Sequence, residues 1–261
     1  MTPAELQAKA EQYRWYHPID LGGYVTKPDN DFSVIWDFIR QNLSSVDFQD
    51  KTVLDIGCRD GLWSLFAESR GALLVGGIDN NISKGAIEFA LPHLKSQVAM
   101  HEANICSYGS VNWDIVLMMG LLYHLRMPML GLFNACECLK KGGLLCIETA
   151  IHAKPSWHDT DEIPMLYCPF LDSPYEAGSI SFFNRLGLTT TLESMGMKFI
   201  SYADLPESQV GPVRRAFFKF EKGEMYPHLR EYWTGTHTGH TSASEKAWQE
   251  EAKQRHVSQS P

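Results

Sequence analysis

The sequence predicts an α/β fold, in which a doubly wound, mostly parallel sheet of seven strands carries helices on both faces. Two observations lead to this prediction. Short apolar runs alternate with helical patterns from residue 52 to residue 220, and strands that alternate with helices in this way build parallel sheets. The chain is also 44% hydrophobic and 21% charged, which provides enough apolar surface for a sizeable core and excludes disorder.

Each predicted strand is a short apolar run, and the runs lie at residues 52–57, 72–79, 97–102, 113–119, 144–149, 197–202 and 215–220. Helical spacing of apolar residues fills the stretches 61–70, 82–94, 128–140 and 184–196. The third helix has the clearest bounds, because Pro128 stands in its first turn and Gly142 and Gly143 follow its end.

A chain of 261 residues is expected to form one domain with extensions. Residues 1–30 are polar and rich in aromatic side chains, and we expect them to act as a lid over the ligand of the domain. The domain itself spans residues 31–221, with an insertion at 150–183 that interrupts the alternating pattern and is expected to shape the substrate pocket. Residues 222–261 form a C-terminal tail.

Composition narrows the class of protein. The formal net charge is −8, which argues against a broad nucleic-acid surface, since phosphate binding depends on Lys and Arg. The longest apolar stretch, residues 115–122, is far shorter than the roughly 20 residues that cross a bilayer. The N-terminus has no apolar run like that of a signal peptide, and the six cysteines indicate reduced thiols. We therefore expect a cytoplasmic protein without a membrane partner.

The strongest local motif is a glycine-containing turn between the first predicted strand and the first predicted helix. It runs through Asp55, Gly57, Cys58 and Gly61, and glycine there lets the backbone approach a ligand closely. The next strand ends at Asp79, where an acidic residue commonly accepts hydrogen bonds from a ribose. Because ligands of such sheets bind beyond the carboxyl ends of the strands, the turn and the acid predict a nucleotide site.

Two mismatches indicate which nucleotide binds. Counted from Gly57, a dinucleotide motif G-x-G-x-x-G would place glycines where this chain has Arg59 and Leu62, so a pyrophosphate would meet side chains. Asp55 would also add negative charge beside the phosphates. These features disfavour a dehydrogenase. A cofactor without phosphate and with a cationic amino-acid end fits better, and S-adenosylmethionine is such a cofactor.

The motif D-x-G-x-x-x-G, with an acid after the second strand, resembles the class I S-adenosylmethionine-dependent methyltransferases over roughly residues 50–220. The resemblance implies that Asp79 binds the ribose hydroxyls and that Asn80 borders the adenine. Asn104 follows the third strand, where the family often has an acid that contacts the adenine amine, so this position departs from the pattern. The cofactor-binding residues expected on this basis are Asp55, Gly57, Cys58, Gly61, Asp79, Asn80, Asn104, Ile105 and Met119.

Two further segments resemble one group within that family. Residues 12–23, with Thr26 after them, and residues 119–125 are similar to the tRNA uridine-5-oxyacetate (carboxy)methyltransferase-like group. That group contains enzymes that modify the wobble uridine of tRNA and also small-molecule relatives. This chain is short for the tRNA enzymes and it is acidic, which favours a small-molecule acceptor. A tRNA-modifying relative that uses a carboxylated donor, and a non-catalytic cofactor-binding partner subunit, stay open as alternatives.

Tyr123 and His124 follow the fourth strand, at the mouth where donor and acceptor are expected to meet. Tyr123 matches the family's tyrosine near the transferred group, and His124 has the chemistry to accept a proton from an acceptor hydroxyl or amine. The alternative is that both are structural, with Tyr123 packed under the edge of the sheet and His124 capping a helix.

Other polar residues are weaker candidates. Arg126, Arg214 and Arg215 can bind an anionic acceptor or a carboxylated donor, although surface positions explain at least two of them. His152 and the pair His158–Asp159 follow the fifth strand with irregular spacing and without a cluster of Cys or Glu. No metal site is therefore expected.

Overall fold

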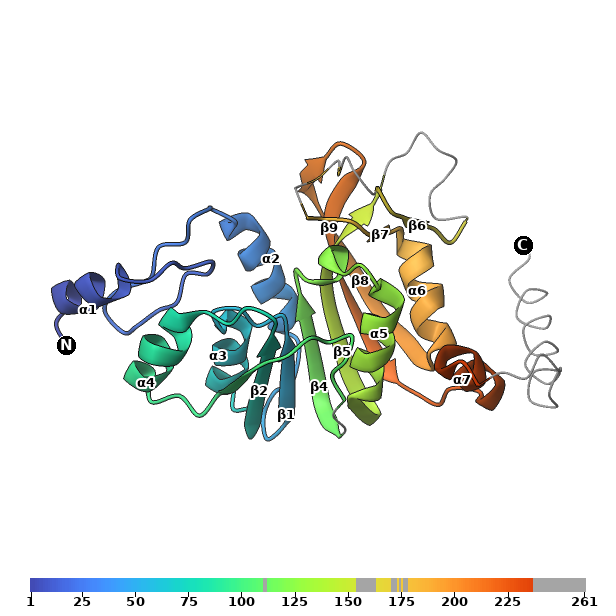
Figure 1. Cartoon of the computed structure of the whole chain (residues 1–261), viewed down its shortest axis with the longest axis horizontal. Coiled ribbons are helices and arrows are strands. Elements are labelled where there is room, and N and C mark those ends of the chain that lie inside the picture. The colour runs from blue at the N-terminus through green and yellow to red at the C-terminus, as the bar shows by residue number, and fades with distance from the viewer. Residues whose placement is uncertain (110–111, 154–162, 170–172, 174, 176–177, 237–261) are drawn as a thin grey trace.

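The computed structural model describes residues 1–109, 112–153, 163–169, 173, 175 and 178–236. Its centre is one sheet of seven strands in the order β3-β2-β1-β4-β5-β9-β8 (Figure 1). The strands are β1 (Thr52–Ile56), β2 (Leu74–Asp79), β3 (Ala99–Glu102), β4 (Trp113–Met119), β5 (Leu139–His152), β8 (Met197–Val210) and β9 (Val213–Lys222). Neighbours from β3 to β5 are parallel, whereas β9 is antiparallel to both β5 and β8. The predicted doubly wound, mostly parallel sheet is confirmed.

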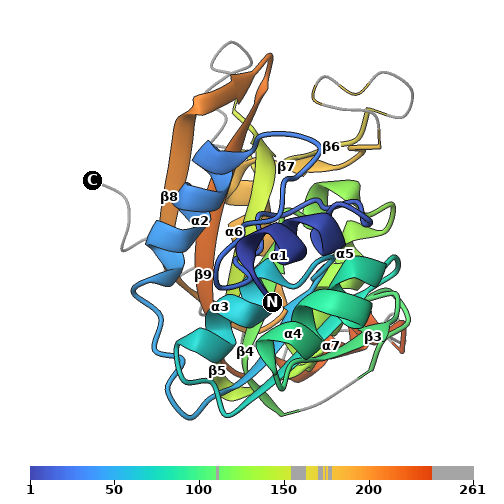
Figure 2. The same cartoon turned by 90° about the vertical axis from the view of Figure 1, so that its left-hand side faces the viewer.

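Helices cover both faces of this sheet (Figures 1 and 2). Helices α2 (Ser33–Leu43) and α3 (Leu62–Ser69) pack on one face, and α5 (Pro128–Glu137) and α6 (Arg185–Ser194) pack on the other. Further helical segments are α1 (Pro3–Ala10), η1 (Ala86–Ala90) continuing into α4 (Leu91–Leu94), η2 (Leu122–His124) and α7 (Pro227–Thr234). A separate ribbon pairs β6 (Leu166–Tyr167) with β7 (Phe182–Phe183). Of the helices in the described residues, none has the length and apolarity needed to cross a bilayer.

Alternating side chains of the central strands separate two hydrophobic layers. Val53, Ile115 and Leu117 belong to the layer that holds α2 and α3, whereas their neighbours Leu54 and Val116 belong to the layer that holds α5 and α6. Successive side chains of a strand point to opposite faces of a sheet, so β1 and β4 are buried on both sides. This double burial explains why these strands are near-continuous apolar runs in the sequence.

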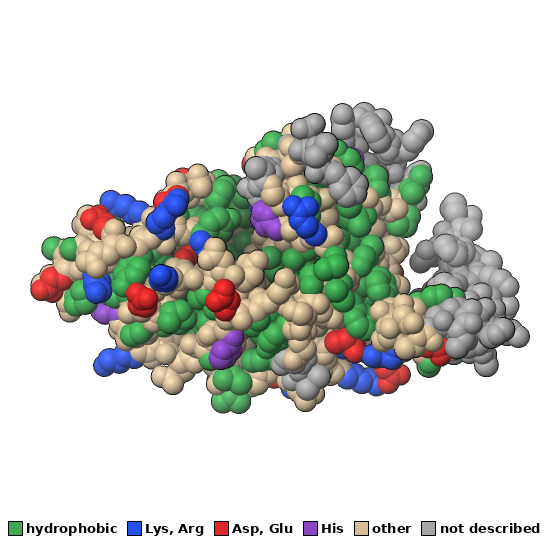
Figure 3. All heavy atoms as spheres, viewed as in Figure 1, with side chains coloured by type: hydrophobic (Ala, Val, Ile, Leu, Met, Phe, Trp, Pro, Cys, Tyr) green, Lys and Arg blue, Asp and Glu red, His purple; other side chains and the backbone are tan. Residues whose placement is uncertain are grey.

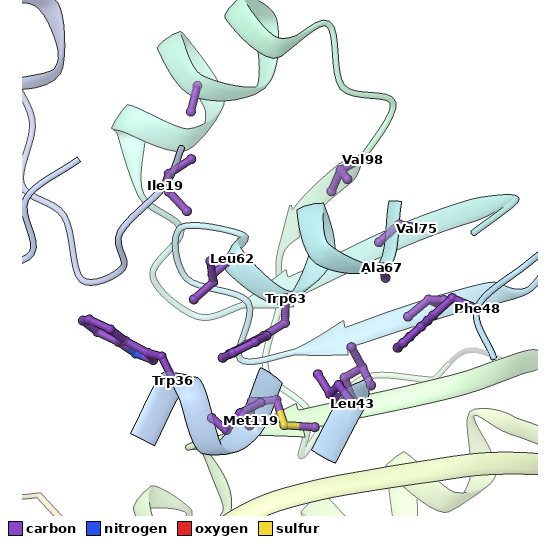
Figure 4. Packing of buried hydrophobic residues seen from close by; sticks show 14 of the residues in the cluster. Ile19, Trp36, Leu43, Phe48, Leu62, Trp63, Ala67, Val75, Val98 and Met119 are labelled. Atoms are coloured by element: carbon purple, nitrogen blue, oxygen red, sulfur yellow. The ribbon is translucent and has the colours of Figure 1, made fainter. Parts of the chain in front are cut away.

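Helix α2 is not among the predicted helices, and burial explains why it forms. Figure 4 shows Trp36 and Leu43 of α2 gathered with Trp63 of α3 and with Met119 at the end of β4. Burying a large apolar side chain contributes roughly 1.5–3 kcal/mol. Contact with the sheet therefore stabilises the helix and also fixes its position above the end of β4.

Residues 1–30 are packed against the domain through apolar contacts. A capping box between Thr2 and Glu5 begins α1. Five apolar residues of the segment are buried in the first layer: Leu6, Ala10, Trp15, Ile19 and Leu21. The ring of Tyr13 also stacks on Phe89 of η1, with ring centroids 6.3 Å apart. The segment is thus part of the core, and its role as a lid stays a prediction.

Some boundaries differ from the predicted ones. The helix predicted for 128–140 ends at Glu137, because the chain enters β5 directly after it. The N–H of Trp113 donates to the carbonyl of Cys138 at 3.0 Å, and Leu139 already pairs with Trp113. Strands β8 and β9 extend well beyond their predicted ends because they pair with each other as a long antiparallel hairpin.

The predicted insertion and tail are described in part. Within the insertion, β5 runs on to His152 and the β6–β7 ribbon follows, while residues 154–162, 170–172, 174 and 176–177 lie outside the described residues. In the tail, α7 is attached to α5, because the guanidinium of Arg230 donates to the carboxylate of Glu137 at 2.8 Å. Residues 237–261 lie outside the described part of the chain.

Candidate functional site

Two adjoining cavities lie at the carboxyl ends of the parallel strands. The first, about 360 Å³, is lined by residues at or after the ends of β1, β2, β3 and β4. The second, about 480 Å³, is lined mainly by residues of the N-terminal segment, α2, β4, β5 and β9 and of the turns after β1, β2 and β4. Six residues line both cavities: Gly57, Asp79, Asn80, Leu121, His124 and Leu125. Figure 3 shows a hollow in this face of the molecule, left of centre. The two cavities therefore share a wall.

The glycine turn after β1 brings backbone to that wall. Gly57 has a φ of +82°, and a Cβ there would lie 3.1 Å from the Cβ of Leu121, so the position requires glycine. The N–H groups of Gly57 and Cys58 donate to the carbonyl of Ile78 on β2, at 2.8 and 3.2 Å. Gly61 has a φ of +83° and is the N-cap residue of α3. The turn is therefore fixed to the second strand, and the adjacent cavity can accept a ligand close to backbone.

Asp79 lies at the junction of the two cavities. One carboxylate oxygen accepts the N–H of Arg59 at 3.0 Å and the other accepts the N–H of Asn81 at 2.8 Å. Burial raises the pKa of Asp79 above its ordinary value, and these backbone hydrogen bonds counteract the rise. Each oxygen keeps a further lone pair, so the carboxylate can accept hydrogen bonds from two adjacent hydroxyl groups.

The first cavity has mostly apolar walls. Four of the predicted cofactor residues line it together with Gly57, namely Asp79, Asn80, Asn104 and Ile105. The side-chain oxygen of Asn104 accepts the N–H of Cys106 at 2.9 Å, so part of its hydrogen-bonding capacity already serves the turn after β3. A flat, apolar ring with one polar edge suits this lining.

The remaining predicted cofactor residues lie elsewhere. Met119 lines the second cavity, whereas Asp55, Cys58 and Gly61 are in the lining of neither cavity. The carboxylate of Asp55 accepts the hydroxyl of Ser64 at 2.7 Å, and complete burial raises the pKa of Asp55 to about 7. Burial also raises the pKa of Cys58. Both side chains point into the domain, so their effect on a ligand would be exerted through backbone position or through charge.

Tyr123 and His124 both line the second cavity. The chain after β4 is the short helix η2, and helical geometry lets two consecutive side chains reach the same space, which an extended chain would prevent. Tyr123 is 1% exposed. His124 donates from Nδ1 to the carbonyl of Gly178 at 3.2 Å, and it lines the first cavity as well.

A buried ion pair forms the floor of the second cavity. Arg215 of β9 donates from Nε to Glu148 of β5 at 2.6 Å, and a second hydrogen bond from Nη2 completes a bidentate contact. Its Nη1 donates to the hydroxyls of Tyr123 at 2.8 Å and Tyr175 at 3.2 Å. Burial alone would lower the pKa of Arg215, but the carboxylate of Glu148 raises it well above its ordinary value.

The sequence analysis named Arg215 but not Glu148 or Tyr175. The sequence does show one acidic and one basic residue within two apolar runs that are predicted to be strands. These residues are Glu148 and Arg215. Charged residues are seldom buried unless they are paired, so each of these charges required a partner. Nothing in the linear sequence placed the two strands side by side, however.

The N-terminal segment closes one side of the second cavity. The N–H groups of Tyr16 and His17 both donate to one carboxylate oxygen of Asp60, at 2.7 and 2.8 Å. The rings of Phe32 and Trp36 lie beside them in the cavity wall. The sequence analysis singled out none of these four as a site residue. It treated residues 16 and 17 as part of a resemblance only.

The weaker candidates from the sequence analysis differ in whether they line a cavity. Arg126 lines the first cavity, whereas Arg214 pairs with Asp204 at 2.7 Å, away from both linings. The buried His152 packs edge-on against the ring of Tyr167, with centroids 5.4 Å apart. The pair His158–Asp159 lies outside the described residues.

Comparison with known families identifies the class to which this fold and site belong. The family described as "Methyltransferase domain" matches residues 31–202, about two thirds of the chain. The chain therefore belongs to the methyltransferase domain family, and its fold is that of the class I S-adenosylmethionine-dependent methyltransferases.

Among curated proteins, the chain is similar to the tRNA U34 carboxymethyltransferase of Pseudomonas putida (strain W619), with 31% identity over 138 residues. That match covers 51% of this chain and 42% of the relative, so the chain matches less than half the length of that enzyme.

Two solved structures illustrate the shared fold. The N-terminal domain of EvdMO1 with SAH bound has a TM-score of 0.61 and 16% identity, over 86% of this chain and 98% of that one. An S-adenosylmethionine-dependent methyltransferase from Mesorhizobium loti has a TM-score of 0.52 and 14% identity, over 72% of this chain and 97% of that one. At these identities, the similarity establishes the fold.

Proposed function

We propose that the protein binds S-adenosylmethionine with its nucleoside in the first cavity and its sulfonium toward the second, and that it methylates a small molecule held in the second cavity. One observation carries this proposal. The two cavities share a wall, and Asp79 and the glycine turn lie in it. A donor can therefore extend from one cavity into the other and present its reactive carbon to an acceptor.

The residues of the first cavity fit the nucleoside of this cofactor. Asp79 would accept hydrogen bonds from the two ribose hydroxyls, while its own backbone partners keep the carboxylate in place. Asn80 and Ile105 would flank the adenine, and Asn104 would lie near its polar edge. The left-handed Gly57 provides the close backbone approach. These assignments agree with the expectations from the motif and give the cofactor a preformed site.

Charge also fits a cationic donor better than a phosphate. Asp55 lies two residues before Gly57 and is fully buried. Burial raises the pKa of Asp55 to about 7, because no neighbouring positive charge offsets the cost of burying its ionised form. A cofactor with a positive amino-acid end would supply part of that compensation across the turn, whereas a pyrophosphate would add repulsion. We therefore expect no binding of NAD.

The second cavity suits a small acceptor. At about 480 Å³ it is within the usual range for small-molecule sites, and part of it would hold the methionine end of the donor. Aromatic rings of Tyr16, Phe32 and Trp36 form its outer wall. Of these rings, Tyr16 belongs to residues 1–30, so a lid formed by that segment would help to exclude water from the acceptor.

The cofactor supplies a methyl group on a cationic sulfur, and the protein has to align that carbon with the acceptor atom. Tyr123 is placed for this alignment, since its hydroxyl is held by Arg215 at the floor of the second cavity. His124 lies at the boundary of the two cavities, and we assign it either proton acceptance or a local structural role through Gly178.

A second candidate is carboxymethyl transfer to tRNA, the activity for which the Pseudomonas putida relative is named. In its favour, the guanidinium of Arg215 lines the second cavity, where a carboxylated donor would meet it. Against it, Glu148 already compensates that charge, and the chain has a net charge of −8. A third candidate, a cofactor-binding subunit without turnover, would share the first cavity and differ only in activity.

Two measurements separate these candidates. Native mass spectrometry of the purified protein identifies any retained donor, and a carboxylated donor would favour the tRNA candidate. A small-molecule cell extract and bulk tRNA are then incubated with S-adenosylmethionine tritiated at its methyl group and, separately, with the carboxylated donor tritiated at the group it transfers. The fraction that gains tritium identifies the acceptor. We expect label in the small-molecule fraction. Label in tRNA would contradict the small-molecule proposal, and tight cofactor binding with no label in either fraction would favour the non-catalytic subunit.

A further inference from the structure

Resting on the proposed function, we infer that His17 takes the proton from the acceptor and that Asp60 positions it for this task. The inference also narrows the substrate class, because a proton acceptor is useful only for a nucleophile that carries a proton, such as a hydroxyl or an amine. The centre would thus combine a base from the N-terminal segment with a donor site built by the sheet.

The side chain of His17 is held from several directions. Its Nδ1 lies 3.4 Å from the carboxylate of Asp60, and the two side chains are 7% and 1% exposed. Its ring packs edge-on against Tyr16 with centroids 4.8 Å apart and lies 6.1 Å from the ring of Trp36. The hydroxyl of Thr26 also donates to the carbonyl of His17 at 2.8 Å. The imidazole is therefore a fixed group within the wall.

Asp60 is suited to direct the imidazole because it remains a carboxylate. Burial would raise the pKa of Asp60, but its contacts with His17, with Ser83 and with the N–H of Tyr16 hold the pKa below its ordinary value. A carboxylate beside Nδ1 favours the tautomer with the proton on Nδ1 and the lone pair on Nε2. The 3.4 Å contact is long for a hydrogen bond, as is common before a substrate is bound.

The same imidazole lines the second cavity. With Nδ1 turned toward Asp60, the opposite edge of the ring, which carries Nε2, is left for the cavity. The carboxylates of this cavity are already engaged: Glu148 binds Arg215, and Asp79 binds two backbone N–H groups. His124 also lines the cavity and is the rival base, since its Nδ1 contacts the carbonyl of Gly178. A carbonyl stabilises an imidazolium less than the carboxylate that lies beside His17, so we assign the proton to His17.

Methyl transfer and proton removal are linked at the acceptor atom. Nε2 of His17 takes the proton of the acceptor O–H or N–H, and the lone pair of that oxygen or nitrogen forms the bond to the methyl carbon. The carbon–sulfur bond of the donor breaks and its electron pair stays on sulfur, which becomes neutral. The imidazolium formed is stabilised by the carboxylate of Asp60. No oxidant, reductant or metal takes part.

This arrangement gives the N-terminal segment a chemical role in addition to its packing. The N–H groups of residues 16 and 17 bind Asp60, which lies in the glycine turn, and these bonds help to hold His17 at the cavity. The turn that would position the donor thus also positions the base. Binding of the donor and proton acceptance would therefore be coupled through one loop.

A spectroscopic experiment tests the tautomer without any turnover. Protein labelled with nitrogen-15 at histidine is compared with His17→Gln to assign the His17 signals, with S-adenosylhomocysteine present. We expect the proton on Nδ1 in the wild type and a loss of that preference in Asp60→Asn. A proton on Nε2 in the wild type, in a protein that still binds S-adenosylhomocysteine, would overturn the inference while leaving the proposed function intact.

A kinetic experiment tests the base directly with two probe acceptors. At mildly alkaline pH, phenol still carries its proton, whereas 4-nitrophenol is largely ionised. We expect His17→Gln to lower turnover of phenol by roughly 10²-fold or more and that of 4-nitrophenol only a few-fold, with unchanged affinity for S-adenosylhomocysteine by calorimetry. The control His101→Gln, an exposed histidine of β3 outside both linings, should leave both rates unchanged.

Equal losses for the two acceptors in His17→Gln would assign His17 a structural role and overturn the inference. Failure of the wild type to bind S-adenosylhomocysteine would instead overturn the proposed function, so the two failures are distinguishable.

Discussion

The two cavities are built in different ways. The first is lined by residues at or shortly after the carboxyl ends of four parallel strands, β1 to β4, so each lining residue is close in sequence to the strand that positions it. The second joins residues from distant parts of the chain: Arg215 donates to Tyr123, 92 positions away, and His17 donates to Asp60, 43 positions away. The first cavity is therefore a local product of the sheet, whereas the second exists only once the whole chain has folded.

The difference predicts different consequences of mutation. Variants of the first cavity should weaken the binding of the cofactor and leave the fold intact, because the polar groups of this cavity lie at strand ends. Variants at the floor of the second cavity should first cost stability, because its charges are buried and depend on one another. Variants at Arg215, Asp79 and Tyr123 examine this contrast, and a variant at Asp55 examines the buried charge beside the glycine turn. They are given in order of decreasing expected effect.

The largest effect is expected for Arg215→Met, which leaves Glu148 buried without its partner. Removing one member of a buried pair costs about 3–5 kcal/mol of unfolding free energy, measured by urea denaturation. The double variant Arg215→Met with Glu148→Leu should recover most of that loss. The control is Arg214→Met, whose partly exposed pair with Asp204 should cost under about 1 kcal/mol. Equal costs at 214 and 215 would contradict the account of the cavity floor.

The next effect is a pH dependence from Asp55, whose pKa is raised by burial from 3.8 to about 7. Between those values the unfolded chain ionises this carboxyl while the folded protein keeps its proton, so the unfolding free energy falls as the pH rises. The stabilisation by the protonated Asp55 is fully present below pH 3.8, the pKa in the unfolded chain. It is lost as the pH rises through about 7, the pKa in the folded protein, and it amounts to at most about 4 kcal/mol. Asp55→Asn should lack this component when both proteins are unfolded at several pH values without cofactor. If the unfolding free energies of the wild type and of Asp55→Asn depended on pH in the same way, the raised pKa of Asp55 would be contradicted.

Asp79→Ala should affect binding and leave the fold intact. Losing a charged acceptor of the ribose hydroxyls costs about 1.5–3 kcal/mol of affinity for S-adenosylhomocysteine, measured by calorimetry. Glu102→Ala is a matched control, because Glu102 ends the neighbouring strand opposite Asp79 in the sheet register but lines neither cavity. Unchanged affinity in a folded Asp79→Ala protein would remove this carboxylate from the cofactor site.

The smallest change in binding is expected for Tyr123→Phe, which keeps the ring and removes the hydroxyl that accepts from Arg215. Turnover should fall while the affinity for the cofactor stays within about 1 kcal/mol. Slow methyl transfer to water serves as the readout until an acceptor is known. A variant with full turnover and its fold confirmed by circular dichroism would move the alignment of the acceptor to another residue.

The contrast between local and long-range construction also explains which features could be predicted from the sequence. The sheet, the glycine turn and the position of Asp79 at a strand end were predictable, because parallel strands leave apolar runs whose carboxyl ends meet at one edge. The cofactor-binding role of Asp79 stays a prediction. Helix α2 was not, since its burial depends on a surface that other elements create. The pairing of Glu148 with Arg215 and of His17 with Asp60 depends on which segments become neighbours. No local pattern encodes the strand order or the packing of residues 1–30.

The central claim is that the shared wall of the two cavities holds S-adenosylmethionine, and calorimetry of the wild-type protein tests it most directly. S-adenosylmethionine, S-adenosylhomocysteine and NAD are titrated separately into protein from which any retained ligand has been removed. The account predicts micromolar binding of the two sulfur-containing cofactors and no heat of binding for NAD. Binding of NAD with no response to S-adenosylmethionine would contradict it.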